Sequence, residues 1–298
     1  MADEWDWLKK VPGAPGSRGI PDVIPSISSG VPDDGAEARR APVPVVGDDT
    51  NSSLKQGDLV ASRWRIEEKV GEGAYGEVYR AFNTDYAETV ALKTFHDRLL
   101  GDPRRREAFK REALTWVSLD WHPFILAATW AAVYSGRLFV ETDYIAPDED
   151  GRVTLADWLR LAPGPIQVIR ALEWAIQFCL GMEHANAHGM SCHRDIKPTN
   201  ILIDREGRVR IGDFGLALDI EQSWSGKAPQ AAPSGGERPG RSVFAAGGPQ
   251  VCGSPGYMAP EVLDGVEADV LSDIYSFGVV LWQMATGTPL SPFAPAFS

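Results

Sequence analysis

A short polar stretch, "HRDIKPTN" at residues 193–200, brings together three groups that suit phosphoryl transfer. Asp195 can accept the proton of an attacking hydroxyl, and Lys197 can neutralise a phosphoryl group in transit. The side-chain oxygen of Asn200 can bind Mg²⁺. The stretch is too polar for a buried strand and too irregular for one face of an amphipathic helix, so it is read as a loop that presents these groups.

A second motif, "DFG" at residues 213–215, supplies a carboxylate shortly after this loop. Asp213 suits a metal ion that also contacts the β and γ phosphates of a nucleotide. A single tripeptide of this kind is often an ordinary polar turn, but here it follows the loop motif. Asn200 and Asp213 are therefore the candidate Mg²⁺ ligands.

The glycine-rich stretch "GEGAYGEV" at residues 71–78 is a candidate phosphate-binding loop. The spacing of its glycines alone fits a dinucleotide-binding turn, a lid over ATP phosphates or an ordinary hairpin. A dinucleotide-binding turn would open a helix at once, whereas "EVYRAF" and "TVALKTF" continue as strands. We therefore expect a hairpin whose backbone approaches phosphate closely.

Lys93 lies in the otherwise apolar strand segment "TVALKTF". A lone lysine there would extend its ammonium to water. Beside a phosphate-binding loop, the ammonium can instead pair with phosphate oxygens while a carboxylate holds it in place. The following helix offers Glu107 and Glu112, and Glu112 is favoured because it begins the better apolar run.

The elements that position these groups fall into two parts. Residues 59–95 alternate short β-branched runs with turns, residues 102–119 have helix-forming composition, and residues 124–145 form a second strand pair that turns at Ser135-Gly136. After Pro147 the pattern becomes helical, with Thr154 and Asp157 as an N-terminal cap and Gly189 as a stop. Two short strands, "NILID" and "VRIGDF", follow.

Five motifs in order, "GEGAYGEVY", "VALK", "HRDIKPTN", "DFG" and "GSPGYMAPE", resemble the eukaryotic-type protein kinases, in the form common among bacterial serine/threonine kinases. The resemblance runs from about Leu59 to Pro289. It implies an α+β, two-lobed fold: a small antiparallel lobe with one helix at 58–146 and a mainly helical large lobe at 147–298. By the resemblance, the chain ends inside the large lobe, which leaves apolar faces of its central helix, including Trp282, without cover.

Two segments are low in complexity. Residues 1–57 are rich in Pro, Gly and Ser and are predicted to be a disordered leader. Residues 221–250 are predicted to be a flexible insertion in the activation segment. By the resemblance, Arg194 indicates regulation by phosphorylation of that segment. The candidate sites in it are Ser223, Ser225, Ser234 and Ser242.

The resemblance also implies roles for individual residues. The residues that it places around ATP are Val70, Gly71, Gly73, Gly76, Val78, Ala91, Lys93, Thr142, Asp143, Ile145, Leu202 and Asp213. It makes Asp195 the base and Lys197 the γ-phosphate contact, and it pairs Lys93 with Glu112. His193 is expected to pack and hold the loop, and Asp273 to brace it. Lys197 and Ser254 favour serine or threonine as the acceptor.

Composition excludes several classes of partner. Lys and Arg total 29 against 41 Asp and Glu, a net charge of −12, which argues against nucleic acid and anionic lipid. The three cysteines, Cys179, Cys192 and Cys252, have no metal-ligand spacing, and a reducing compartment fits them best. Without a secretory signal or a bilayer-length apolar segment, a cytoplasmic protein is expected. The sequence does not determine the oligomeric state.

The leading hypothesis is a Mg²⁺- and ATP-dependent protein serine/threonine kinase. The alternative is a catalytically impaired pseudokinase or scaffold, although Lys93, Asp195 and Asp213 are all present. A dinucleotide-dependent oxidoreductase does not fit the strands that follow the glycines, and it leaves "HRDIKPTN" and "DFG" unexplained. A small-molecule phosphotransferase of kinase-like fold is harder to exclude. However, "GSPGYMAPE" resembles the peptide-binding segment of protein kinases and favours a protein acceptor.

Overall fold

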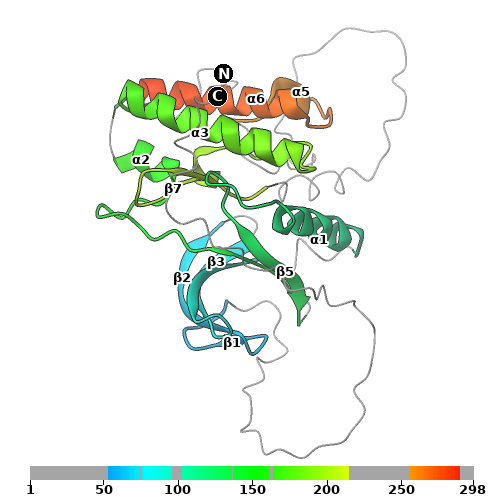
Figure 1. The fold of residues 1–298 in the computed structure, drawn as a ribbon. Helices are drawn as coiled ribbons and strands as arrows, with labels where there is room; N and C mark the ends of the chain where they lie inside the picture. The colour runs from blue at the N-terminus through cyan, green and yellow to red at the C-terminus, as the bar shows by residue number, and fades with distance from the viewer. Residues whose placement is uncertain are drawn as a thin grey trace, which may run out of the picture. The chain divides into compact units, whose positions relative to one another are not determined.

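The structure is a computed structural model that describes residues 53–73, 76–95, 103–135, 137–161, 164–214 and 256–288 (Figure 1). Most of the predicted leader lies outside these residues. The predicted insertion at 221–250, its four candidate serines and Ser254 also lie outside them.

The first part of the described chain is an antiparallel sheet with the strand order β1-β2-β3-β4-β6-β5. Its strands are β1 (Leu59–Val60), β2 (Trp64–Glu72), β3 (Gly76–Asn83), β4 (Glu88–Phe95), β5 (Ala128–Tyr134) and β6 (Arg137–Asp143). The strands and the turn at Ser135 lie where the alternation of apolar and polar residues predicted them. The sheet is the framework for the glycine loop and Lys93.

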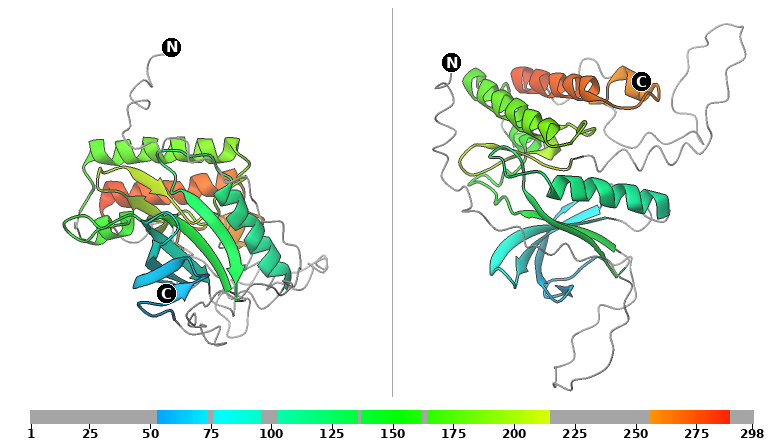
Figure 2. Two further views of the ribbon diagram at one scale, coloured as in Figure 1. Left: turned by 60° about the horizontal axis from the view of Figure 1, so that its bottom comes forward. Right: turned by 45° about the vertical axis from the view of Figure 1, so that its right-hand side comes forward.

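One helix, α1 (Pro103–Val117), packs beside β5, as both views in Figure 2 show. Its last turn is fixed by Trp116, which is buried and donates its indole N–H to the carbonyl of Leu126 at 2.9 Å. The Trp116 ring also lies 6.1 Å from the ring of Phe214, measured between centroids. The helix is therefore anchored to the segment that carries Asp213.

The second part is mainly helical. It contains α2 (Leu155–Leu161), α3 (Val168–Ala187), the 3₁₀ turn η3 (Pro198–Asn200), the β-ribbon of β7 (Ile201–Ile203) and β8 (Val209–Ile211), α5 (Pro260–Leu263) and α6 (Val270–Thr286). The predicted cap of α2 is confirmed, because the Asp157 carboxylate accepts from the backbone N–H of Thr154 at 3.0 Å and from its hydroxyl at 2.9 Å. None of the helices in the described ranges is long and apolar enough to cross a membrane.

Two apolar clusters lie on opposite faces of the sheet. One joins α1 and the sheet to α3, β7, β8 and α6, and it includes Phe95, Phe178 and Phe214. The other lies on the outer face of β2, β3 and β4, where Leu54 packs against it. Residues 53–57, assigned to the leader from composition, therefore contact the sheet.

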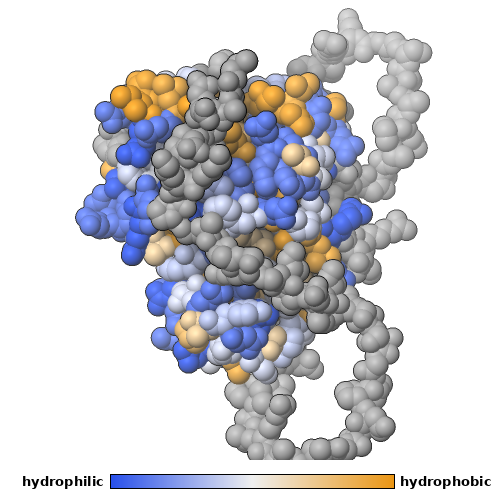
Figure 3. Space-filling model, viewed as in Figure 1, coloured by the Kyte–Doolittle hydropathy of each residue, from blue (hydrophilic) through white to orange (hydrophobic). Residues whose placement is uncertain are grey.

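Helices α3 and α6 pack side by side through the stacked rings of Phe178 and Phe277, whose centroids are 4.0 Å apart. Other apolar side chains on both helices are exposed, among them Ile169 on α3 and Ile274 on α6. Figure 3 shows hydrophobic residues gathered over this end of the molecule. The prediction of an uncovered apolar face on α6 is confirmed, although Trp282 itself is partly buried.

Gly76 begins β3 where no side chain fits. A Cβ atom on Gly76 would lie 1.9 Å from the carbonyl oxygen of Thr94 on β4, whereas one on Gly73 would meet no described atom within 4 Å. We expect Gly76→Ala to lower the free energy of unfolding by about 3 kcal/mol, since neither backbone can move without breaking the ladder. Gly73→Ala is the matched control. Equal urea midpoints for the two variants would contradict this account.

Three imidazoles stack between the segment before β5 and the end of α3. The His184 ring lies 4.7 Å from that of His122 and 4.0 Å from that of His188. Burial, helped by the nearby charges of His184, Arg210 and His188, lowers the pKa of His122 from 6.5 to about 4. The imidazole of His188 in turn lies 3.6 Å from the carboxylate of Asp120.

The folded chain therefore keeps His122 neutral at a pH where the unfolded chain protonates it. Its contribution to stability is complete above pH 6.5 and is lost as the pH falls towards 4. We expect up to about 3 kcal/mol of unfolding free energy to disappear over this range. His122→Asn should flatten the dependence of unfolding free energy on pH, measured by urea titration. An unchanged slope would assign the effect to other groups.

Candidate active site

The glycine-rich segment is an antiparallel hairpin between β2 and β3, closed by a hydrogen bond from Gly73 N to Gly76 O of 2.8 Å. This confirms the expected hairpin and excludes the strand-to-helix turn of a dinucleotide-binding fold. The sheet register places Lys93 opposite Val78 on β3 and Ala91 opposite Thr142 on β6. Because directly opposed residues share a face, these four predicted ATP contacts lie on one face of the sheet.

Lys93 pairs with Asp213, not with Glu112 as the sequence predicted. Its ammonium lies 2.6 Å from Asp213 Oδ1. The backbone of Asp213 has φ of 63°, an uncommon conformation for a residue with a side chain, and its carboxylate reaches the lysine. The contact joins β4 of the sheet to the segment after β8.

Glu112 instead pairs with Arg194, whose Nη1 lies 2.6 Å from Glu112 Oε1. Arg194 also has a positive φ, 71°, and its Nε contacts Cys192 Sγ at 3.4 Å. The predicted Lys93–Glu112 pair is thus replaced by two pairs, one between β4 and the segment after β8 and one between α1 and the loop at 193–200. The choice of partner depends on how α1 is placed, which no local pattern encodes.

The charge of Asp213 is set by opposing effects. Burial alone would raise the pKa of its carboxyl group, but the ammonium of Lys93, with smaller contributions from Lys197 and His193, holds that pKa below its ordinary value of 3.8. Asp213 is therefore ionised at neutral pH, as a metal or phosphate site requires.

The loop at 193–200 gathers its polar groups on one carboxylate. Asp195 Oδ2 accepts from Lys197 Nζ at 2.7 Å and from Asn200 Nδ2 at 2.9 Å. Both of these donors reach the same oxygen, so Oδ1 is the atom that remains for a third partner. The structure therefore brings together the three residues that the sequence singled out.

The loop is braced from below by Asp273 of α6. Its carboxylate accepts from the backbone N–H groups of His193 at 2.5 Å and Arg194 at 2.9 Å. His193 is buried, and its Nε2 lies 2.9 Å from the carbonyl of Gly212, just before Asp213. The predicted bracing role of Asp273 and packing role of His193 are confirmed. Burial raises the pKa of Asp273 despite these contacts, so its bonds stabilise the loop at a cost in desolvation.

The chemistry of Asn200 and Asp213 fits a magnesium ion. Asn200 turns its amide nitrogen to the backbone and side chain of Asp195, so its oxygen faces the other way. The backbone N–H of Gly212 donates to the carbonyl of Asn200 at 3.0 Å, which holds the two ligand segments together. One amide and one carboxylate oxygen suit Mg²⁺, which takes few protein ligands beside phosphate oxygens.

The remaining predicted ATP contacts lie around this face. Ile145 and Leu202 are partly buried against the main cluster. The Asp143 carbonyl accepts from the Thr142 hydroxyl at 3.3 Å, and its N–H donates to Ala127 at 3.1 Å. Val70 is exposed, at 45%. The contacts of these residues with ATP stay predictions.

Comparison with known proteins decides the family. Residues 64–295 match the family model described as the protein kinase domain. The chain belongs to the protein kinase family. Two of its relatives are serine/threonine-protein kinase pkn3 of Myxococcus xanthus, with 30% identity over 80% of this chain, and PknB of Mycolicibacterium smegmatis, with 31% identity over 80%. This chain spans 40% and 35% of the length of these two kinases.

A third relative, the DNA damage-responsive serine/threonine-protein kinase RqkA of Deinococcus radiodurans, is 34% identical over 79% of this chain, which spans 31% of its length. Among solved structures, the kinase domain of PknI from Mycobacterium tuberculosis, as a double mutant, matches with a TM-score of 0.61 and 21% identity. The match covers 83% of this chain and 84% of that one. It confirms the two-lobed kinase fold.

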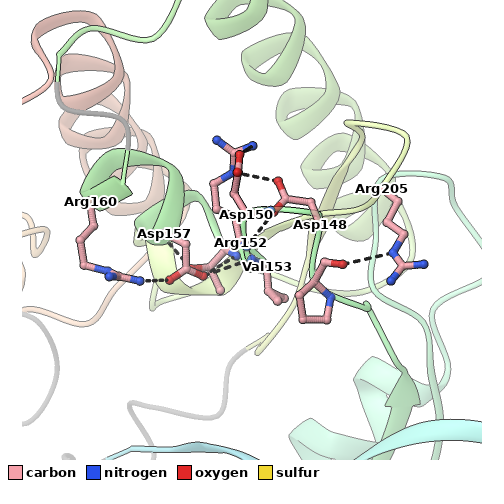
Figure 4. A network of polar contacts seen from close by, with 9 residues as sticks. Asp148, Asp150, Arg152, Val153, Asp157, Arg160 and Arg205 are labelled. Atoms are coloured by element: carbon pink, nitrogen blue, oxygen red, sulfur yellow. Dashed lines mark hydrogen bonds and ion pairs between the residues drawn. The ribbon is translucent and has the colours of Figure 1, made fainter.

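One feature near the kinase site was not anticipated from sequence. The loop between β6 and α2 is tied by Arg152, which pairs with Asp148 at 2.8 Å and Asp150 at 2.6 Å (Figure 4). The Arg152 guanidinium also lies over the ring of Trp158. Arg205 from the β7–β8 turn donates to the carbonyl of Pro147 at 3.1 Å. The three acidic residues at 148–150 followed by Arg152 were a usable signal, but the pairing depends on the loop's path.

Proposed function

We propose that this kinase transfers the γ-phosphoryl group of ATP to serine or threonine hydroxyls of protein substrates. The observation that carries the proposal is the cluster on Asp195, in which Lys197 and Asn200 both contact Oδ2. A carboxylate with one oxygen held by two donors is oriented to accept a proton at the other. The serine/threonine names of the relatives support the choice of acceptor.

In the proposed step, the acceptor oxygen forms a bond to the γ-phosphorus while the bond from that phosphorus to the bridging oxygen of ADP breaks. Asp195 accepts the hydroxyl proton, and Lys197 stabilises the charge on the phosphoryl oxygens. Lys93 holds the α and β phosphates from the sheet, and the glycine hairpin covers them. Catalysis comes mainly from orientation and charge neutralisation.

Magnesium would be held by Asn200 and Asp213 and would neutralise the charge of the β and γ phosphates. Lys93 and Asp213 are already in contact at 2.6 Å, so the lysine and the metal ligand converge on the same phosphates.

We also propose that phosphorylation of the activation segment regulates the site through Arg194. In the structure this guanidinium pairs with Glu112 of α1. A phosphoserine would compete for it with greater charge and would release Glu112 towards Lys93. The sequence-predicted Lys93–Glu112 pair would then describe the phosphorylated state.

The test is transfer of phosphate from γ-labelled ATP with Mg²⁺ to the chain itself and to a generic protein, followed by identification of the labelled amino acid. Label on serine or threonine is expected. A small polyol offered in parallel separates protein kinases from small-molecule phosphotransferases. Tight ATP binding with transfer to none of these acceptors would contradict the proposal and favour a nucleotide-binding scaffold.

A further inference from the structure

A buried carboxylate lies inside the glycine hairpin and has no part in the proposed chemistry. Glu77 follows Gly76 in β3 and is 3% exposed. Its neighbour Val78 belongs to the face of the sheet that carries Lys93, so Glu77 points to the outer face, where Tyr79 is also buried. An ionised group in such a place costs several kcal/mol unless donors surround it.

Four donors from separate segments surround Glu77. Oε1 accepts from the hydroxyl of Ser53 and from Lys69 Nζ at 3.3 Å. Oε2 accepts from the hydroxyl of Tyr79 at 2.7 Å and from Arg137 Nη2 at 3.0 Å. Although burial alone would raise it, the hydrogen bonds from Ser53, Tyr79 and Lys69 lower the pKa of Glu77 to about 2, so the carboxylate is charged at physiological pH.

The donors connect the two arms of the hairpin to the rest of the sheet. Lys69 lies on β2 just before Gly71, and a register shift separates Lys69 from Gly71. Arg137 begins β6, which lies across β4 from β3, so it ties the returning arm to a distant strand. Because both arms are held at one carboxylate below the tip, the height of the glycines above the Lys93 face is fixed.

We infer that Glu77 is a positioning residue that holds the glycine hairpin at the height at which its backbone meets the phosphates of ATP. The inference rests on the proposed ATP-binding function and extends it to a group on the opposite face of the sheet. Ser53 adds a contact from the segment before β1, so residues 53–57 contribute to the same support.

The direct test is calorimetric binding of ATP with Mg²⁺, and of adenosine, to the full chain and to Glu77→Gln. The amide keeps the size of the side chain but loses the charge that satisfies Lys69 and Arg137. We expect the Kd for ATP to rise about tenfold, the effect of losing one charge-assisted contact. The Kd for adenosine, which has no phosphates, should change by less than about twofold.

Glu173→Gln is the matched control, because Glu173 pairs with Arg170 at 3.6 Å within α3, outside the sheet and its hairpin. It should leave both constants unchanged. If Glu77→Gln does not fold, Ser53→Ala replaces it, because it removes one donor to Glu77 at an exposed position. The Kd for ATP should then rise about two- to threefold, and the Kd for adenosine should not change.

Equal losses of ATP and adenosine binding, or no change in a folded variant, would overturn the inference and leave the proposed function intact. Binding of ATP without transfer by the unsubstituted chain would overturn the proposed function, while the ratio of the two constants would still decide the role of Glu77. Failure of the unsubstituted chain to bind ATP would overturn both.

Discussion

Asp195→Asn is expected to lower the rate of phosphate transfer about 10³-fold while the Kd for ATP changes by less than about twofold. The structure gives the reason. Lys197 and Asn200 both donate to Oδ2, and the amide oxygen of the variant can occupy that position and keep both contacts. The amide nitrogen then replaces Oδ1, the atom that would take the hydroxyl proton, and it cannot accept one. Single-turnover transfer and calorimetric ATP binding measure the two effects separately.

Asp150→Asn is the matched control, because Asp150 is an exposed carboxylate that pairs with Arg152 in the β6–α2 loop. It should transfer phosphate at the unsubstituted rate. If Asp195→Asn retained full turnover, Asp195 would not be the base. If it lost ATP binding as well, the loop would have collapsed and the variant would report on structure instead of chemistry.

Local patterns were sufficient for most of the fold. The alternation in "TVALKTF" predicts a strand that buries Leu92 and presents Lys93, and the register against β3 and β6 agrees. The cap at Thr154 and Asp157 was also readable, because capping depends on residues three positions apart. Each of these elements is thus encoded by residues that are close together in the sequence.

Contacts between distant segments were predicted less well. The sequence assigned Glu112 to Lys93, but in the structure each of the two has another partner. Lys93 pairs with Asp213 in the segment after β8, and Glu112 pairs with Arg194. Glu77 was given no role from the sequence, because the motif "GEGAYGEV" was interpreted for its glycines alone. Ser53, Lys69 and Arg137 are far apart in sequence, and only the folded sheet brings them to one carboxylate.

Lys93→Met is expected to lower kcat/KM by more than about 100-fold, with a higher KM for ATP as well as a lower kcat. The substitution removes the phosphate contact and also leaves Asp213 without its closest cation. Burial already acts to raise the pKa of Asp213, and Lys93 is the main group that opposes it. The pKa of this carboxyl should therefore rise in the variant.

The pH dependence separates these two losses. Protonated Asp213 cannot bind a metal ion, so the acidic limb of the kcat/KM profile should move to higher pH in Lys93→Met. Lys55→Met, at an exposed lysine before β1, should leave the limb in place. A variant that lost activity equally at every pH would show that Lys93 binds phosphate without tuning Asp213, and the 2.6 Å contact would then have no role in metal binding.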